Sequence, residues 1–328
     1  EVVGTRIDEV VQLIRGKKGS VVRLDVLPAD AGADAAHRII TLVRDKISLE
    51  KQAAQKTVLS VKAGDATRKI GVITLPAFYE DFEARRKREK DYRSASRDVA
   101  KLLEELKQEQ VDSVLIDVRN NGGGSLDEAI ALTGLFIGSG PVVQQRSSDG
   151  KVVVSSSEFP EPIWTGPVGV LINRGSASAS EIFAAAIQDY GRGVVIGEPS
   201  FGKGTVQTVV DLDQMVRNSK PAFGELKVTI AQFFRVNGGT TQLHGVTPDI
   251  SLPGLSDPTR FGETSYDNAL PWSEIKPADY APANTVTALL PTLQGRHDAR
   301  VASDPEFQRL LEDIADIKAQ REKGTVSL

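Results

Sequence analysis

Cysteine is absent from this chain of 328 residues. The absence excludes a disulfide framework, a thiol nucleophile and thiolate metal sites, and it is compatible with an oxidising compartment. Histidine is nearly absent as well, because the chain has only His37, His244 and His297. These three are widely spaced and form no HExxH-like pattern, which argues against a histidine-rich metal site.

The chain also lacks an excess of basic residues and long apolar runs, and these absences exclude further classes of protein. The formal net charge of −4 lacks the basic excess that nucleic-acid binding needs. No apolar run reaches the roughly 18 residues of a membrane span. The chain begins at Glu1 without a methionine or an apolar leader, so we expect a fragment of a longer protein whose targeting signal lay upstream. What remains is the composition of a globular protein, with 40% hydrophobic and 26% charged residues.

The middle of the chain alternates between apolar strands and helices. We predict strands at residues 69–79, 111–119, 166–174, 193–199 and 204–212, and another within 225–252. Helices are predicted after the turns at 120–125 and 175–180, and a further one has the apolar face Val99, Leu102, Leu103 and Leu106. Residues 80–97 are highly charged without an apolar stripe, and we expect a mobile loop there. The pattern indicates an α/β core with parallel strand pairing.

The two ends of the chain differ from this core. Residues 1–47 are predicted to form a helix (6–16) and two strands (20–29 and 37–47), too little to bury a core alone. After residue 255 the chain is proline-rich and is expected to be irregular until a final helix at 304–323. Asp304 is the expected cap of that helix, and Pro305 occupies its first position.

The stretch "GEPSFGKGT" (197–205) contains most of a phosphate-binding loop, GxxxxGK[ST]. Such a loop needs a helix after it and a Ser or Thr directly after the lysine. Here Gly204 follows Lys203, and the next residues, "TVQTVVDL", are β-branched and strand-like. We therefore expect no nucleotide binding, and Lys203 is either a surface lysine in a glycine turn or a residue with another role.

A second motif offers such a role. "NRGSASASEIF" (173–183) is a turn of small residues between a predicted strand and a helix. Ser176 and Ser180 are readily explained as helix N-caps. The same kind of turn also suits a serine nucleophile, because the next amide points toward a developing oxyanion. With no histidine near any motif, the candidate base is a lysine, which must be buried enough to lose its charge.

The third motif is "DVRNNGGGSL" (117–126), with three consecutive glycines between a strand and a helix. Glycine permits positive φ and a close approach of backbone, so an amide here could be a second oxyanion donor. A plain flexible turn explains the glycines equally well.

Together with "HGVTPDI" (244–250), and in this order, the three motifs closely resemble those of the carboxyl-terminal processing proteases, above all those of Gram-negative bacteria. The resemblance covers essentially the whole chain. It implies a serine endopeptidase with a Ser–Lys dyad that trims or degrades proteins from near their C-termini. Ser178 corresponds to the nucleophile, Lys203 to the general base and Gln207 to the residue that orients the lysine. The implied oxyanion donors are the amides of Ala179 and Gly124.

The resemblance also implies an architecture. We expect a crotonase-like α/β protease core at residues 48–255, the C-terminal half of a PDZ-like domain at 1–47 and an irregular, helical extension at 256–328. The implied location is the periplasm, in association with the inner or outer membrane surface. The implied partners are protein substrates with accessible C-terminal tails and an adaptor lipoprotein. No cofactor, nucleotide or nucleic acid is expected.

Two alternatives to proteolysis stay open beside nucleotide binding. One is a peptide-binding scaffold of the same fold that has lost turnover. The other is a crotonase-type enzyme acting on thioesters, because that class uses a similar strand–glycine–helix arrangement to hold an oxyanion.

Overall fold

The computed structural model describes residue 2 and residues 7–27, 36–45, 53–89, 91–216, 223–256 and 261–323. The chain divides into two compact units, Glu1–Lys51 and Gln52–Leu328, where the sequence places a boundary at residue 47. Within the ranges just given, no helix has both the length and the apolar character needed to cross a membrane.

The first unit contains helix α1 (Ile7–Ile14) and strands β1 (Val21–Val26) and β2 (Arg38–Val43). The strands pair antiparallel. Arg44 links the helix to this hairpin, donating from Nε to the Ile14 carbonyl at 2.7 Å and from Nη1 to the Val21 carbonyl at 3.2 Å. The predicted helix and strands are confirmed, apart from the ends of the predictions at residues 6, 28–29 and 46–47, which lie outside the described residues.

A six-stranded sheet forms the centre of the second unit. Its order is β12-β9-β8-β5-β4-β3. The strands are β3 (Gln55–Ala63), β4 (Ala66–Thr74), β5 (Ser113–Asp117), β8 (Val168–Ile172), β9 (Val194–Gly197) and β12 (Ile250–Ser251). All neighbours from β4 to β12 pair in parallel, and β3 pairs antiparallel with β4 at the edge. The predicted parallel α/β core is confirmed. β3 was not predicted, because its residues are mostly exposed and give no apolar run.

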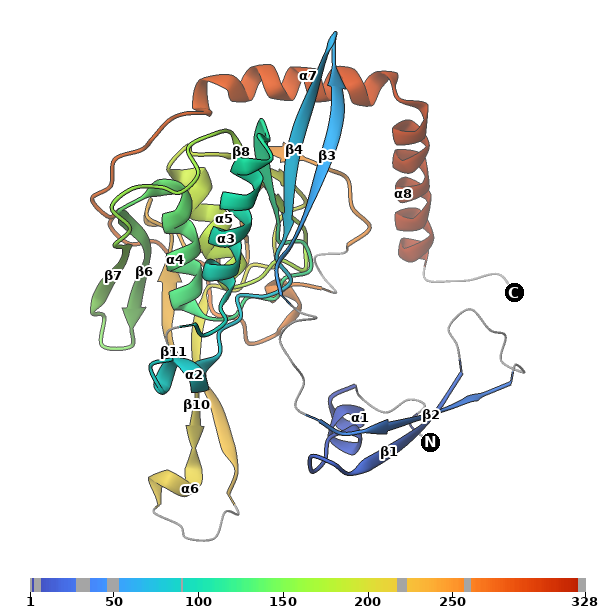
Figure 1. Ribbon diagram of the computed structural model, residues 1–328, viewed down its shortest axis with the longest axis vertical. Helices are drawn as coiled ribbons and strands as arrows, with labels where there is room; N and C mark the ends of the chain where they lie inside the picture. The colour runs from blue at the N-terminus through green and yellow to red at the C-terminus, as the bar shows by residue number, and fades with distance from the viewer. Residues whose placement is uncertain are drawn as a thin grey trace. The chain divides into compact units, whose positions relative to one another are not determined.

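Three helices pack side by side against this sheet: α3 (Ala95–Gln108), α4 (Leu126–Ile137) and α5 (Ala179–Asp189) (Figure 1). The core between them centres on Phe183 of α5, a fully buried residue. Its ring lies 6.4 Å from that of Phe78 and 5.8 Å from that of Phe136. On α3, Val99, Leu103 and Leu106 are buried as predicted, and Leu102 is half-buried.

A second, antiparallel sheet has the order β10-β11-β6-β7. Its strands are β6 (Gly140–Ser147), β7 (Val152–Ser157), β10 (Thr205–Asp211) and β11 (Glu225–Phe234). β10 and β11 form a long arm with the short helix α6 (Leu212–Met215) at its end (Figure 1). The register of this pair shifts between Val206 and Gln207. β6 and β7 were not predicted.

The charged stretch at 80–97 differs from the expectation of a mobile loop. It contains the short helix α2 (Phe82–Arg86), and an isolated bridge pairs Glu80 with Ser94. The Arg85 guanidinium explains this order, because it pairs with the buried Glu80 carboxylate at 2.7 Å and with Asp127 at 2.8 Å. The sequence shows that this stretch is charged, but it does not show which charged residues pair.

The C-terminal region is more regular than predicted. After the 3₁₀ turns Glu263–Ser265 and Thr287–Leu289, helix α7 (Leu290–Ser303) precedes α8 (Pro305–Lys323). The expectation of irregular chain before residue 304 was wrong for α7, since Pro291 lies in its first turn, where a missing N–H costs nothing. The predicted cap of α8 is confirmed, because Asp304 Oδ1 accepts from the amides of Glu306 (3.0 Å) and Phe307 (3.2 Å).

Candidate functional site

Parallel topology brings the three sequence motifs to one edge of the central sheet. The glycine run follows β5, the serine turn follows β8, and the Lys203 loop follows β9. These strands are neighbours and run parallel, so their carboxyl ends meet at the same edge. This edge is where ligands bind in open α/β sheets.

The three serines of the turn differ in burial and in hydrogen bonding. Ser176 and Ser180 are fully buried, and their hydroxyls donate to the carbonyls of Val118 and Asn121, both at 2.8 Å. Ser178 is half-buried and lies directly before α5 with φ 56° and ψ −111°. Positive φ is uncommon for a residue with a side chain, and such strain is concentrated at functional sites. Ser178 is therefore the exposed serine of a tight strand-to-helix turn.

The glycine run touches this turn where a side chain would not fit. A Cβ added to Gly123 would lie 2.9 Å from Ser178 Cβ and 3.1 Å from the Ala179 amide nitrogen. A Cβ on Gly124 would lie 2.3 Å from the Phe78 carbonyl oxygen. Both glycines also have positive φ, 104° and 144° respectively. The run is thus a close backbone contact with the nucleophile turn rather than a flexible connection.

Two amides at this contact are available to an incoming ligand. The Gly123 amide donates to Asn121 Oδ1 at 2.9 Å. Among the hydrogen bonds of the described residues, none uses the amide of Gly124 or that of Ala179. These are the two predicted oxyanion donors, and the structure brings both to the neighbourhood of Ser178.

Lys203 lies in the loop between β9 and β10 and is half-buried. Burial lowers the pKa of its amine, and the nearby charge of Lys227 lowers this pKa further, against smaller effects of Glu263 and Glu181 in the other direction. The direction favours the uncharged amine that a general base requires. A strand, β10, follows this loop, which confirms that the motif lacks the helix of a phosphate loop.

The predicted base and nucleophile do not hydrogen-bond to each other. Lys203 Nζ donates to the carbonyl of Thr205 at 3.2 Å. In the described part of the chain, no hydrogen bond joins Lys203 to the hydroxyl of Ser178 or to Gln207. Gln207 lies on β10 directly after the register shift, and its side chain is exposed.

A cavity of about 660 Å³ opens beside these residues. Lys203, Thr205 and Gln207 line one part of it, and Lys227 and Thr229 of β11 line another. The segment 261–270 completes the wall, where Phe261 packs edge-on against Phe201 with ring centroids 5.6 Å apart. Gly122, Gly175 and Ala177 line the side from which the serine turn comes. The cavity has the size and mixed character of a ligand pocket.

Glu181 is a component of the site that the sequence analysis missed. Its carboxylate is fully buried. Oε2 accepts from the amides of Ser178 (2.7 Å) and Lys203 (3.0 Å), and Oε1 accepts from the Gly202 amide (2.7 Å) and Ser200 Oγ (2.6 Å). Desolvation raises the pKa of Glu181 to about 7, against the effect of these donors. One carboxylate therefore links the serine turn to the lysine loop.

Glu181 had a signal in the sequence. It stands three residues after Ser178 at the start of a helix, which is the S-x-x-E spacing of a capping box. Arg174 was also missed, and no sequence motif marks it as part of the site. It is buried, and it donates to the carbonyls of Phe261 (2.9 Å) and Ser200 (2.8 Å), so it joins the cavity rim to the lysine loop.

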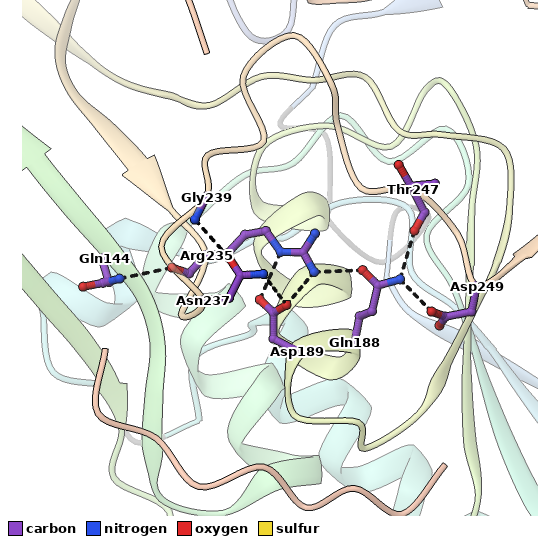
Figure 2. Close-up of polar contacts among 8 residues, drawn as sticks. All are labelled: Gln144, Gln188, Asp189, Arg235, Asn237, Gly239, Thr247 and Asp249. Atoms are coloured by element: carbon purple, nitrogen blue, oxygen red, sulfur yellow. Dashed lines mark hydrogen bonds and ion pairs between the residues drawn. The ribbon is translucent and has the colours of Figure 1, made fainter. Parts of the chain in front are cut away.

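The other end of α5 is anchored by an ion pair (Figure 2). The Asp189 carboxylate accepts from Arg235 Nη2 at 2.6 Å and Nε at 3.0 Å, and from Asn237 at 2.9 Å. Its neighbour Gln188 donates to the Thr247 carbonyl and to Asp249 at 2.9 and 2.8 Å. Arg235 directly follows β11, so this network ties the helix that carries Ser178 to the strand that lines the cavity.

The described residues contain no group of three or more acidic or histidine side chains placed to hold a metal ion. What the arrangement can do is hydrogen-bond an oxyanion at two amides beside a serine hydroxyl, with a half-buried lysine close to the same turn. These are the parts needed for acyl transfer by a serine with a lysine base.

Comparison with known families gives two matches. The profile of peptidase family S41 matches residues 69–252, and that of the C-terminal domain of tail specific protease matches residues 256–328. A tail-specific protease of Haemophilus influenzae is 42% identical over 331 residues, which cover 100% of this chain and 45% of that protein. The carboxy-terminal processing protease CtpA of Bacillus subtilis is 30% identical over 250 residues, 76% of this chain and 46% of the relative.

A solved structure is similar too. The photosystem II D1 C-terminal processing protease has 27% sequence identity and a TM-score of 0.53, over 76% of this chain and 59% of that one. The chain spans about half the length of the curated relatives it matches.

Proposed function

This chain belongs to peptidase family S41, and we propose that it forms the core of a serine endopeptidase that cleaves proteins near their C-termini with a Ser178–Lys203 dyad. Family membership agrees with the resemblance found in the sequence. The observation that carries the catalytic assignment is the backbone of Ser178. It is the half-exposed serine of its turn, at positive φ, between two amides without partners.

The mechanism follows from the groups around Ser178. The uncharged Lys203 amine accepts the proton of the Ser178 hydroxyl as its oxygen attacks a peptide carbonyl carbon. The amides of Ala179 and Gly124 donate to the resulting oxyanion. The Lys203 ammonium then gives its proton to the leaving amine as the C–N bond breaks. Water, deprotonated by the same amine, hydrolyses the acyl-enzyme and releases Ser178.

One side-chain movement is needed before this sequence can begin. Lys203 Nζ donates to the Thr205 carbonyl and, among the described residues, makes no hydrogen bond to Ser178, so its lone pair must come within reach of the Ser178 hydroxyl. Hydrogen bonds between catalytic groups often tighten only when substrate is bound, and we propose that substrate brings the pair together here. Gln207, from the same cavity wall, would then hold the reoriented amine.

Further parts of the proposal concern the larger protein. We place a crotonase-like core at residues 48–255, half of a PDZ-like domain at 1–47 and a helical extension at 256–328. Substrates would be periplasmic proteins with accessible C-terminal tails. An adaptor lipoprotein and association with a membrane surface are parts of the same proposal, which rests on family resemblance.

Replacement of the dyad tests the proposal. Ser178→Ala and Lys203→Ala are each expected to lower the cleavage rate of an unfolded protein by about a thousandfold or more, since the acyl-enzyme cannot form. The exposed residues Ser148 and Lys151 supply matched controls, and Ser148→Ala and Lys151→Ala should cleave normally. Urea unfolding curves check that each variant is folded. Full activity in either dyad variant would contradict the assignment, and an inert wild-type chain would favour the non-catalytic scaffold.

A further inference from the structure

A second lysine lines the cavity, from the strand that pairs with β10. Lys227 lies on β11, two residues from Thr229, and both line the cavity together with Lys203 and Gln207. In the register of the arm, Thr229 is opposite Gln207 and Lys227 is opposite Val209. Lys227 therefore lies two residue pairs farther along the arm than Gln207, and like Thr229 it lines the cavity.

Three charged groups lie around Lys203: Lys227 of β11 and Glu263 line the same cavity, and Glu181 of α5 accepts from the Lys203 amide. Both carboxylates are already engaged. Glu181 accepts from the donors of its own network, and Glu263 Oε1 accepts from Gln242 Nε2 at 3.0 Å. Lys227 differs from them, because in the part of the chain that the structure describes it has no ion pair. The Lys227 side chain is exposed where it lines the cavity, and among the described residues no carboxylate pairs with it.

We propose that Lys227 is a positioning residue for the peptidase reaction, whose ammonium keeps the Lys203 amine uncharged and able to accept the Ser178 proton. The inference rests on the function proposed above. Two like charges in a partly enclosed cavity repel each other, so the charged form of Lys203 is disfavoured. The direction of the Lys203 pKa agrees with this, since Lys227 is the second cause of its lowering after burial.

The repulsion acts at two points of the reaction. Before attack it increases the fraction of Lys203 that can act as a base. After attack Lys203 carries the proton of Ser178, so two cations face each other until the proton passes to the leaving amine. The departure of a neutral amine relieves this repulsion, and no proton is gained or lost over the two steps.

The test is the pH dependence of kcat/KM with a peptide that has no charged side chain. Lys227→Met should move the rise of activity to higher pH, because the neutral form of Lys203 then requires a more alkaline solution. We expect a several-fold loss at neutral pH that disappears on the alkaline plateau. Lys227→Arg should restore the wild-type profile, and Lys227→Glu should move the rise beyond that of Lys227→Met. High salt should narrow these differences.

Lys151→Met, on the exposed β6–β7 hairpin, is the matched control and should leave the profile unchanged. A drop of equal size at every pH, or an unmoved rise in Lys227→Met, would overturn the proposal. So would a changed preference between Asp and Asn peptides with an unmoved rise, because Lys227 would then act on the substrate. Failure of the function itself is distinguishable, since wild type and Ser178→Ala would then show the same lack of cleavage.

Discussion

Ser178 has an uncommon positive φ, and the chain facing it has room only for a glycine, Gly123. Its φ of 56° directs the side chain away from the hydrogen bonds that occupy Ser176 and Ser180. Gly123 closes the opposite side, with the position of its missing Cβ 2.9 Å from Ser178 Cβ. Backbone shape rather than charge therefore distinguishes Ser178, the proposed nucleophile, from the other two serines of the turn.

A methyl group at Gly123 should damage this arrangement more than one at its neighbour. Gly123→Ala places a carbon against Ser178 and forces an alanine to φ 104°, which we expect to cost about 1–3 kcal/mol of stability and most of the cleavage activity. For stability, Gly122→Ala is the matched control, because its Cβ would have nothing within 4 Å. Urea unfolding and peptide cleavage measure the two effects. Equal behaviour of both variants would refute the close-contact explanation.

At the scale of elements, helix α5 determines where Ser178 lies, because this residue directly precedes it. Its first turn is held by Glu181 and its last by the Asp189–Arg235 pair, so both ends are fixed to neighbours that line or support the cavity. The Asp189 side chain is only 5% exposed, and burial raises its pKa while Arg235 opposes the change. A helix fixed at both ends cannot slide along its axis without breaking buried polar contacts.

Removal of the arginine should therefore be costly. Arg235→Met leaves the Asp189 carboxylate buried without its counter-ion, and we expect a loss of about 3–5 kcal/mol in the free energy of unfolding. The exposed pair Arg68–Asp112 provides the comparison, since Arg68→Met should cost about 1 kcal/mol or less. Urea denaturation at neutral pH decides between them, and similar losses for the two variants would show that the Asp189 pair is not an anchor.

Elements with a strong apolar period were predictable from the sequence, and those stabilised by long-range contacts were not. The sequence shows β5, β8 and β9 as short apolar runs. Turns rich in glycine or serine follow β5 and β8, and they mark the starts of α4 and α5. β3 was missed because it lies exposed at a sheet edge. α7 was missed because Pro291, in its first turn, suggests irregular chain. At the site, Ser178 and Lys203 came from motifs. Arg174 could not be predicted, because its partners Phe261 and Ser200 are distant in sequence.

At the scale of the whole molecule, buried carboxyl groups link stability to pH. Glu181 has a pKa of about 7 in the folded protein against an ordinary 4.5. Between these values the folded state holds a proton that the unfolded state has released. The stabilisation from this group is therefore complete below pH 4.5 and is lost as pH rises through 7.

Glu181→Gln should remove this dependence. From the two pKa values, the contribution of Glu181 to the free energy of unfolding falls by on the order of 3 kcal/mol across that window. We expect a flatter change of stability between mildly acidic and mildly alkaline pH in the variant, and lower stability overall because an amide N–H replaces an acceptor. Urea denaturation at several pH values measures how the free energy of unfolding changes with pH. Glu161→Gln, at an exposed site, should keep the wild-type slope, and an unchanged slope in Glu181→Gln would exclude this explanation.

Glu181 also has a mechanical consequence. Its carboxylate accepts from the backbone amides of Ser178 and Lys203, and beside it the Phe201 amide donates to the Ser176 carbonyl at 2.9 Å. A movement that separated the serine turn from the lysine loop would have to break all of these hydrogen bonds. We therefore expect any change between an inactive and an active arrangement to leave these two backbones together and to reorient the Lys203 side chain.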